Sequence, residues 1–207
     1  MNKYVPLFIF ILYLLTTGIC LYISYNKLEE IIPTISVTGM YKPEYYCYAG
    51  GFGLISIIAI YLSYTFIPKL HNKIVEKLNS FKYILLFLEK LCIIASIFIG
   101  VQGYISISMN YMIHEVTAYV GMYYFILYFT FLTVIFINYP GIISIESATI
   151  KLIIIIINYL SWFLMNQNIL KYINKHYGLD DFNVWGIAQR LIVTTLFAYF
   201  ATFYLDY

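Results

Sequence analysis

The sequence is poor in charged residues, because Asp, Glu, Lys and Arg together make up only 11% of its 207 residues. An ordinary soluble domain is about 25% charged and about 45–50% apolar, whereas 62% of this chain is hydrophobic. A soluble domain of this length leaves about 30% of its surface exposed, so it cannot hide this much apolar surface. The composition therefore excludes a water-soluble globule and an intrinsically disordered chain.

Basic residues do not gather into a dense face, and the formal net charge is only +2. A nucleic-acid partner requires such a face to neutralise phosphates, so we expect no nucleic acid among the partners.

The short motifs of common catalytic and cofactor sites are also missing. The chain has no glycine-rich phosphate loop, no Cys-x-x-Cys pair, no His-Glu-x-x-His and no Gly-x-Ser-x-Gly. We therefore expect no cofactor. A zinc site would need ligands from several elements. His114 and His176, with Glu115 or with Asp180 and Asp181, form one such combination. We interpret these side chains as solvated loop residues and predict no metal.

Long apolar runs are the dominant feature of what is present. Six runs are long enough to cross a bilayer, which takes about 20 residues per helix. An open strand cannot satisfy its backbone in lipid, so each run is expected to be a helix. The expected helices cover about residues 5–24, 47–67, 91–112, 117–138, 150–165 and 184–205. The predicted fold class is all-α, with residues 1–207 forming one polytopic integral membrane domain, a bundle of six transmembrane helices.

The start of the third helix has two interpretations. The apolar segment Phe81–Leu88 precedes Glu89 and Lys90, so the helix begins either near Phe81, with this charged pair buried, or at Leu91. A charge at mid-bilayer costs at least ~2.5–3.5 kcal/mol, and the second interpretation avoids that cost twice. We therefore expect a basic cytosolic loop over residues 68–90, with Phe81–Leu88 in the membrane interface.

The orientation follows from the distribution of loop lysines. With the N-terminus in the cytosol, seven lysines lie inside and four outside. The inside set is Lys3, Lys69, Lys73, Lys77, Lys82, Lys90 and Lys151, and the outside set is Lys27, Lys42, Lys171 and Lys175. We therefore predict cytosolic N- and C-termini, with the loop over residues 25–46 on the lumenal or extracellular face.

The three cysteines have two interpretations. Cys20 and Cys47 fall near one membrane face and Cys92 near the other, so a Cys20–Cys47 disulfide is geometrically allowed. Buried cysteine more often acts as a small hydrophobe, and we favour that interpretation.

The loop before the second helix is rich in turn-forming residues. Ser36 and Thr38 are expected to satisfy turn amides, and Gly39 permits a positive φ. Pro43 followed by Glu44 is typical of a helix start, where the helix dipole favours an acid. The candidate binding or structural motif is Pro33, Ser36, Thr38, Gly39, Pro43 and Glu44. The motif either forms a structural cap on the lumenal side of the helices or binds a ligand, and the two roles are compatible.

A lumenal polar cluster is expected from His114, Glu115, Gln189 and Arg190. An Arg within a membrane helix indicates a functional site, and an acidic partner is expected beside it. The available acids on that face are Glu44, Glu115, Asp180 and Asp181. In the alternative interpretation, Arg190 snorkels to the headgroups.

These residues carry a resemblance to the DRAM (damage-regulated autophagy modulator) family. The segment Pro33–Gly39, followed by Pro43-Glu44, resembles the family's first-loop pattern, roughly PYISDTG and then PE. Three further patterns are similar to those of the family: Tyr199-Phe200-Ala201-Thr202-Phe203 followed by Asp206, Ile113-His114-Glu115, and Glu89-Lys90-Leu91. The chain departs from the family at Val37 and Gln189, where an acid is usual, and at Arg190, where an aromatic is usual.

The resemblance implies a six-helix protein of lysosomal or endosomal membranes, with the Golgi or plasma membrane as alternatives. It implies a regulator of autophagy or endolysosomal membrane function that acts through membrane lipids or membrane protein partners. The lack of a convincing catalytic set favours a role that is not enzymatic. The wider superfamily includes Golgi proteins of GPI-anchor lipid remodelling. An alternative is therefore a remodelling enzyme or cofactor in which His114 and Glu115 supply acid–base chemistry. A further alternative is a structural subunit of a membrane complex.

Overall fold

The computed structural model describes residues 3–25, 33–177 and 181–206, without the side chains of residues 167, 173, 176, 177, 181 and 182. The helices are α1 (Val5–Ser24), α2 (Ile35–Thr38), α3 (Glu44–Thr65), α4 (Ile67–Lys77), α5 (Lys82–Tyr104), α6 (Tyr111–Asn138), α7 (Ile145–Leu164), α8 (Gln167–Tyr177) and α9 (Asp181–Thr202). Short 3₁₀ turns cover Asn79–Phe81 and Phe203–Asp206. Six helical segments are long and apolar enough to cross a membrane, and no strand occurs in the described part. The predicted all-α membrane fold is confirmed.

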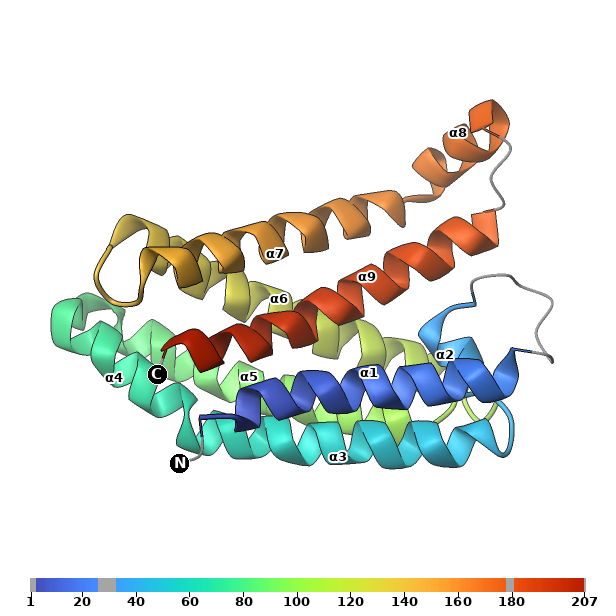
Figure 1. Ribbon diagram of the computed structural model, residues 1–207, viewed down its shortest axis with the longest axis horizontal. Helices are drawn as coiled ribbons and strands as arrows, with labels where there is room; N and C mark the ends of the chain where they lie inside the picture. The colour runs from blue at the N-terminus through green and yellow to red at the C-terminus, as the bar shows by residue number, and fades with distance from the viewer. Residues whose placement is uncertain (1–2, 26–32, 178–180, 207) are drawn as a thin grey trace.

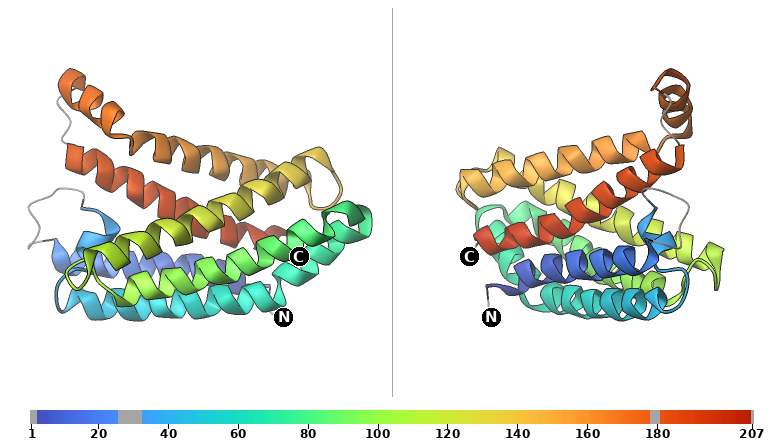
Figure 2. Two further views of the ribbon diagram at one scale, coloured as in Figure 1. Left: turned by 180° about the vertical axis from the view of Figure 1, so that it is seen from behind. Right: turned by 45° about the vertical axis from the view of Figure 1, so that its right-hand side comes forward.

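The long helices form a single bundle (Figure 1). Helix α3 packs between α1 and α5, α5 packs on α6, and α9 packs on both α1 and α7. The two chain ends lie at the same end of the bundle, here called the terminal end, as an even number of crossings requires. The short helix α2 lies at the opposite end, here called the α2 end (Figures 1 and 2).

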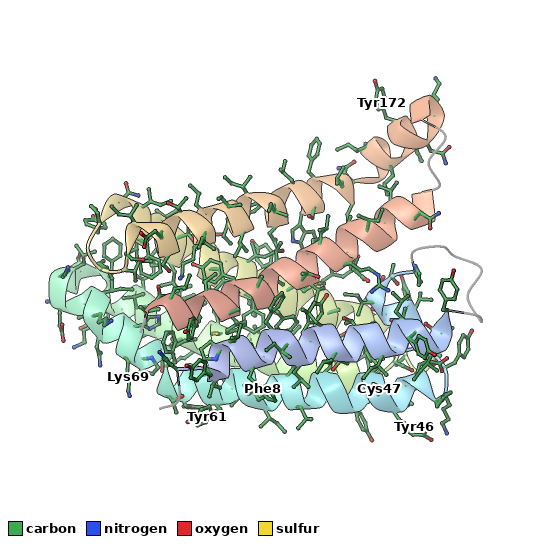
Figure 3. The ribbon with its side chains drawn as sticks, in the orientation of Figure 1. Phe8, Tyr46, Cys47, Tyr61, Lys69 and Tyr172 are labelled. Carbon is green, nitrogen blue, oxygen red and sulfur yellow. The ribbon has the colours of Figure 1, made fainter. Side chains whose placement is uncertain are left out.

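The outer surface of the bundle is apolar and aromatic. Phe8 on α1 is 53% exposed and Tyr61 on α3 is 47% exposed, and both project away from the bundle (Figure 3). A soluble protein rarely exposes large contiguous apolar patches, whereas hydrocarbon chains solvate such a surface. The helices therefore bury one face against each other and present the other to lipid.

Polar caps place two helix starts earlier than the hydropathy of the sequence predicts. Helix α6 begins at Tyr111, and not at 117, because the Asn110 side chain accepts a hydrogen bond from the Ile113 amide (3.0 Å). Helix α7 begins at Ile145, and not at 150, because the Ser144 hydroxyl accepts from the Ser147 amide (3.1 Å). A cap satisfies free backbone groups regardless of hydropathy, so it extends a helix beyond its apolar run.

The third long helix follows the interpretation that the sequence disfavoured. Helix α5 begins at Lys82 and ends at Tyr104, so the expected boundaries of 91 and 112 are wrong. Glu89 does not face lipid, because its carboxylate lies 3.6 Å from the imidazole of His71 on α4. The α4–α5 hairpin projects furthest at the terminal end (Figures 1 and 2), and Glu89 is the eighth residue of α5 counted from that end. Glu89 therefore lies nearer the terminal end of the helix than its midpoint, for which the desolvation cost was assumed.

Two segments that the expected membrane helices leave out form amphipathic helices. Helix α4 occupies much of the expected loop over 68–90, with Leu70, His71 and Ile74 buried and its lysines outside. Helix α8 lies in the segment between α7 and α9 and projects from the α2 end (Figure 1). Charged residues at helical spacing around an apolar stripe form an interfacial helix as readily as a loop.

A buried ion pair joins α7 to the C-terminal turn. Lys151 Nζ lies 2.9 Å from an Asp206 carboxylate oxygen, and both side chains are fully inaccessible to solvent. The Ser147 hydroxyl donates to the same carboxylate (2.6 Å), and the Lys151 ammonium lies 5.6 Å from the ring centroid of Phe203. Lys151 is thus a core residue, and counting it among the loop lysines was wrong. Without Lys151, six loop lysines lie on the predicted cytosolic side and four on the opposite side.

The cysteines are free thiols in the structure. Cys20 and Cys92 are buried and Cys47 is partly buried. The Cys20 thiol donates to the Glu44 carbonyl (3.6 Å), so it packs at the junction of α1 and α3. This packing matches the interpretation of the cysteines as small hydrophobic residues.

Candidate functional site

The segment before α3 folds into α2, a single helical turn at the end of the bundle. Thr34 is its N-cap and accepts a hydrogen bond from the Val37 amide (3.3 Å), while the Thr38 hydroxyl donates to the Ile35 carbonyl (2.7 Å). The expectation that Ser36 and Thr38 satisfy turn amides is therefore wrong. Thr34 does so, because only an oxygen at the N-cap faces the free amides of the first turn.

Gly39 closes α2 with a φ of −106°, so the positive φ that glycine permits is not used here. A Cβ at this position would overlap the ring of Tyr48 and lie 2.7 Å from Tyr48 Cβ. Tyr48 is itself buried and donates to the Gln102 side-chain oxygen (2.9 Å). Glycine is required here because the side chain of Tyr48 packs against its Cα, and not because of its backbone freedom.

Polar contacts from α6 and α9 hold α2 in place. The Ile35 amide donates to the Gln189 side-chain oxygen (2.8 Å), and Arg190 Nε donates to the Pro33 carbonyl (3.0 Å). The contact shown for Arg190 is thus to a main-chain oxygen, where a carboxylate was expected. Of the expected acids, Asp180 and the side chain of Asp181 lie outside the described residues.

His114 makes the third contact with α2. Its Nδ1 lies 2.7 Å from the Ile105 carbonyl, and its Nε2 lies 2.8 Å from the Ser36 hydroxyl. A carbonyl oxygen only accepts, so Nδ1 carries the proton and, in the neutral imidazole, Nε2 accepts from Ser36. His114 is only 2% exposed, and both of its ring nitrogens are engaged. It is therefore a buried, oriented base and not the solvated loop residue expected.

A pocket of about 260 Å³ opens between α2, α6 and α9. Its polar lining is Thr34, Ser36, His114, Glu115 and Gln189, and its apolar and aromatic lining is Val37, Ile107, Tyr111, Ala118, Tyr119, Met122 and Trp185. A neighbouring cavity of about 20 Å³ shares Ser36 and Gln189 and adds Tyr48 and Gln102, a size and polarity that suit one water molecule. Few polar groups set among apolar and aromatic walls are typical of a small-molecule site.

The structure brings together four of the predicted site residues, Ser36, His114, Glu115 and Gln189, as lining of this pocket. Pro33 and Arg190 join α2 to α9 beside it. Thr38, Gly39, Pro43 and Glu44 do not line it and instead build α2 and the start of α3, where Glu44 is 1% exposed. The expected helix start at Pro43-Glu44 is confirmed, because α3 begins at Glu44 and not at 47.

Several lining residues were not predicted from the sequence. Trp185 precedes Gln189 by four positions, and Tyr111 precedes His114 by three, so each pair shares one helix face. Helical spacing around the predicted polar residues was therefore the available signal.

Metal-ligating groups do not converge in the described part of the chain, where no three His, Cys, Asp or Glu side chains are close enough to hold an ion. The side chain of His176, which belongs to the metal hypothesis, lies outside the described residues.

Replacing Gln189 tests the attachment of α2. Gln189→Leu removes the acceptor of the Ile35 amide, so we expect the attachment of α2 to weaken by on the order of 1 kcal/mol. Gln189→Glu keeps an oxygen acceptor and serves as the matched variant. Hydrogen exchange of the Ile35 amide is the measurement. Equal exchange in the two variants would contradict the role of the side-chain oxygen.

Comparison with known proteins gives one match. Residues 2–207 match the family model described as the Frag1/DRAM/Sfk1/Cwh43P N-terminal domain. No curated protein and no solved structure matches the chain.

Proposed function

The chain belongs to the family of Frag1/DRAM/Sfk1/Cwh43P N-terminal domains, and from this premise we propose that it is a non-catalytic membrane regulator that binds a lipid in the pocket at the α2 end. The observation that carries the proposal is the pocket itself, with its polar lining of Ser36, His114 and Gln189 beside apolar walls. A lipid presents the same division, because a polar headgroup joins apolar chains.

The biological setting is part of the proposal. The resemblance of the α2 segment to the DRAM first-loop pattern supports a role in autophagy or endolysosomal membrane function, at a lysosomal or endosomal membrane. The Golgi and plasma membranes are the alternative compartments, and membrane protein partners are the alternative ligands. Localisation of a tagged copy decides between the compartments.

We propose that the terminal end faces the cytosol. Lys69, Lys73, Lys77 and Lys82 all belong to α4 or the start of α5 at that end, and the lysine count without Lys151 still favours it. Protease protection of a C-terminal tag in sealed vesicles tests this orientation, since a lumenal tag would be protected.

Filling the pocket tests the proposed function. Ala118 lines the pocket, so Ala118→Trp places a large side chain inside it without replacing any residue that bonds α2. We expect this variant to fold, to lose lipid that co-purifies with the wild type, and to fail to restore autophagic flux in a deletion strain. Ala49→Trp on α3, outside the pocket lining, is the control. Full restoration of flux by Ala118→Trp would contradict the proposal.

A second candidate function, ester chemistry on lipids, is favoured by the contact between Ser36 and His114. In that reaction Ser36 Oγ attacks an ester carbonyl, His114 Nε2 takes the hydroxyl proton, and the alcohol leaves with that proton. Water or a second alcohol then releases the acyl group from Ser36. The Ile105 carbonyl would orient the imidazole, as a third group does in catalytic triads.

Ser36→Ala separates the two functions through the lipid profile, because it removes the nucleophile together with the hydrogen bond to His114. A regulator that binds lipid keeps an unchanged acyl-chain profile in this variant, and any loss of autophagic flux comes only from weaker attachment of α2. An enzyme loses activity by orders of magnitude, and acyl-chain analysis of phospholipids and GPI anchors shows the loss. Ser108→Ala, which removes a hydroxyl outside the pocket lining, is the matched control.

A further inference from the structure

A separate pocket lies at the terminal end of the bundle, between α4 and the start of α5. It has a volume of about 240 Å³, and its lining combines polar and charged groups with apolar side chains such as Leu85 and Leu86. His71, Lys82 and Glu89 supply the titratable groups. The pocket belongs to the hairpin that projects furthest at this end (Figures 1 and 2), far from α2.

His71 presents an unused nitrogen in this pocket. The residue is 4% exposed, and its Nε2 lies 3.1 Å from the Tyr128 hydroxyl. Its Nδ1 is buried without a hydrogen-bond partner in the described part of the chain, and the Glu89 carboxylate at 3.6 Å is too far for a hydrogen bond. When Nε2–H donates to Tyr128, Nδ1 and Glu89 are two acceptors that face one another. A donor with several N–H groups satisfies both.

Lys82 provides the opposite charge on the same side of α5. It precedes Glu89 by seven residues, which is two helical turns and about 10 Å along the helix. A lysine ammonium is a good phosphate ligand. The pocket thus offers acceptors toward one end and a cation toward the other, with apolar side chains between them.

We propose that this pocket binds a phospholipid whose headgroup carries a primary ammonium, as ethanolamine and serine headgroups do. The ammonium donates to His71 Nδ1 and to the Glu89 carboxylate, and Lys82 holds the phosphate. A choline headgroup has the same phosphate and the same charge but no N–H, so it cannot donate to either acceptor. The site is distinct from the α2 pocket and does not depend on the function proposed for it.

Competition between two lipids tests the proposal. The full chain, purified in detergent, is incubated with equimolar dioleoyl phosphatidylethanolamine and dioleoyl phosphatidylcholine, and native mass spectrometry measures the retained lipid. We expect a preference for phosphatidylethanolamine of about tenfold, the effect of a charge-assisted hydrogen bond. Equal retention of the two lipids by the wild-type chain overturns the proposal. Displacement by free phosphoethanolamine at lipid concentrations would also overturn it, because the apolar lining would then contribute nothing.

Variants assign the roles within the pocket. Glu89→Gln is expected to abolish the preference for phosphatidylethanolamine. Lys82→Met is expected to weaken the binding of both lipids equally and to keep the ratio in which they are retained. Glu76→Gln, at an exposed position of α4 outside the pocket lining, is the matched control. An unchanged ratio in Glu89→Gln contradicts the assignment. The wild-type ratio decides the proposal even where a pocket variant fails to fold.

Discussion

Lys151→Met is expected to destabilise the bundle by about 3–5 kcal/mol, because it leaves the Asp206 carboxylate buried without its counter-charge. Methionine keeps the volume of the side chain, so the loss is electrostatic and not a cavity effect. Unfolding of the purified protein in mixed micelles, followed by circular dichroism, is the measurement.

Two further variants identify the cause of that loss. Lys69→Met removes an exposed lysine from α4 at the same end (Figure 3) and is expected to change stability by less than about 0.5 kcal/mol. The double variant Lys151→Met with Asp206→Leu removes both charges, so most of the lost stability should return. If the double variant is as unstable as the single one, the ion pair is not the origin of the effect.

Gly39→Ala is expected to displace α2 and to remove the pocket at that end. The added Cβ overlaps Tyr48, and the ring cannot move aside because it is buried, bonded to Gln102 and packed on Phe52 at 4.6 Å between centroids. Overpacking of this kind costs about 1–3 kcal/mol, and here relief is available only by moving α2. The expected result is loss of lipid that co-purifies with the pocket and faster hydrogen exchange at Ile35.

Gly50→Ala is the matched control for this substitution. Gly50 lies in the first turns of α3, and a Cβ there meets nothing within 4 Å. Alanine also favours the helix, so this variant is expected to be at least as stable as the wild type. A Gly39→Ala protein that keeps lipid binding and slow exchange at Ile35 would show that the close approach to Tyr48 is unimportant.

The sequence alone was sufficient for the class of fold and for the helix cores. Apolar runs of about 20 residues admit few alternatives in lipid, which is why α1 matches its expected range of 5–24. The helix starts were less predictable, because Asn110 and Ser144 act through local geometry that hydropathy does not report. Glu89 shows the same limit, since the pocket that it lines is completed by residues of α4 whose position beside α5 hydropathy does not report.

The candidate site was predictable as a set of residues and not as a set of contacts. Ser36, His114 and Gln189 stood out as polar residues near membrane helices, yet their pairing depends on α2 packing between α6 and α9. Lys151 was missed because a lone lysine beside an apolar run looks like a loop residue. Its partner lies 55 positions along the chain, a separation at which sequence spacing carries no information on contact.

The way in which α2 is held has a consequence for the pocket beside it. Gln189 and His114 each make one hydrogen bond to α2 and Arg190 makes one to Pro33 before it, whereas the long helices bury extended apolar faces. Detaching such a turn costs far less than unfolding the bundle, so it belongs to the local openings that precede global unfolding. Because Thr34, Ser36 and Val37 line the pocket, each such opening of α2 also removes one wall of that pocket.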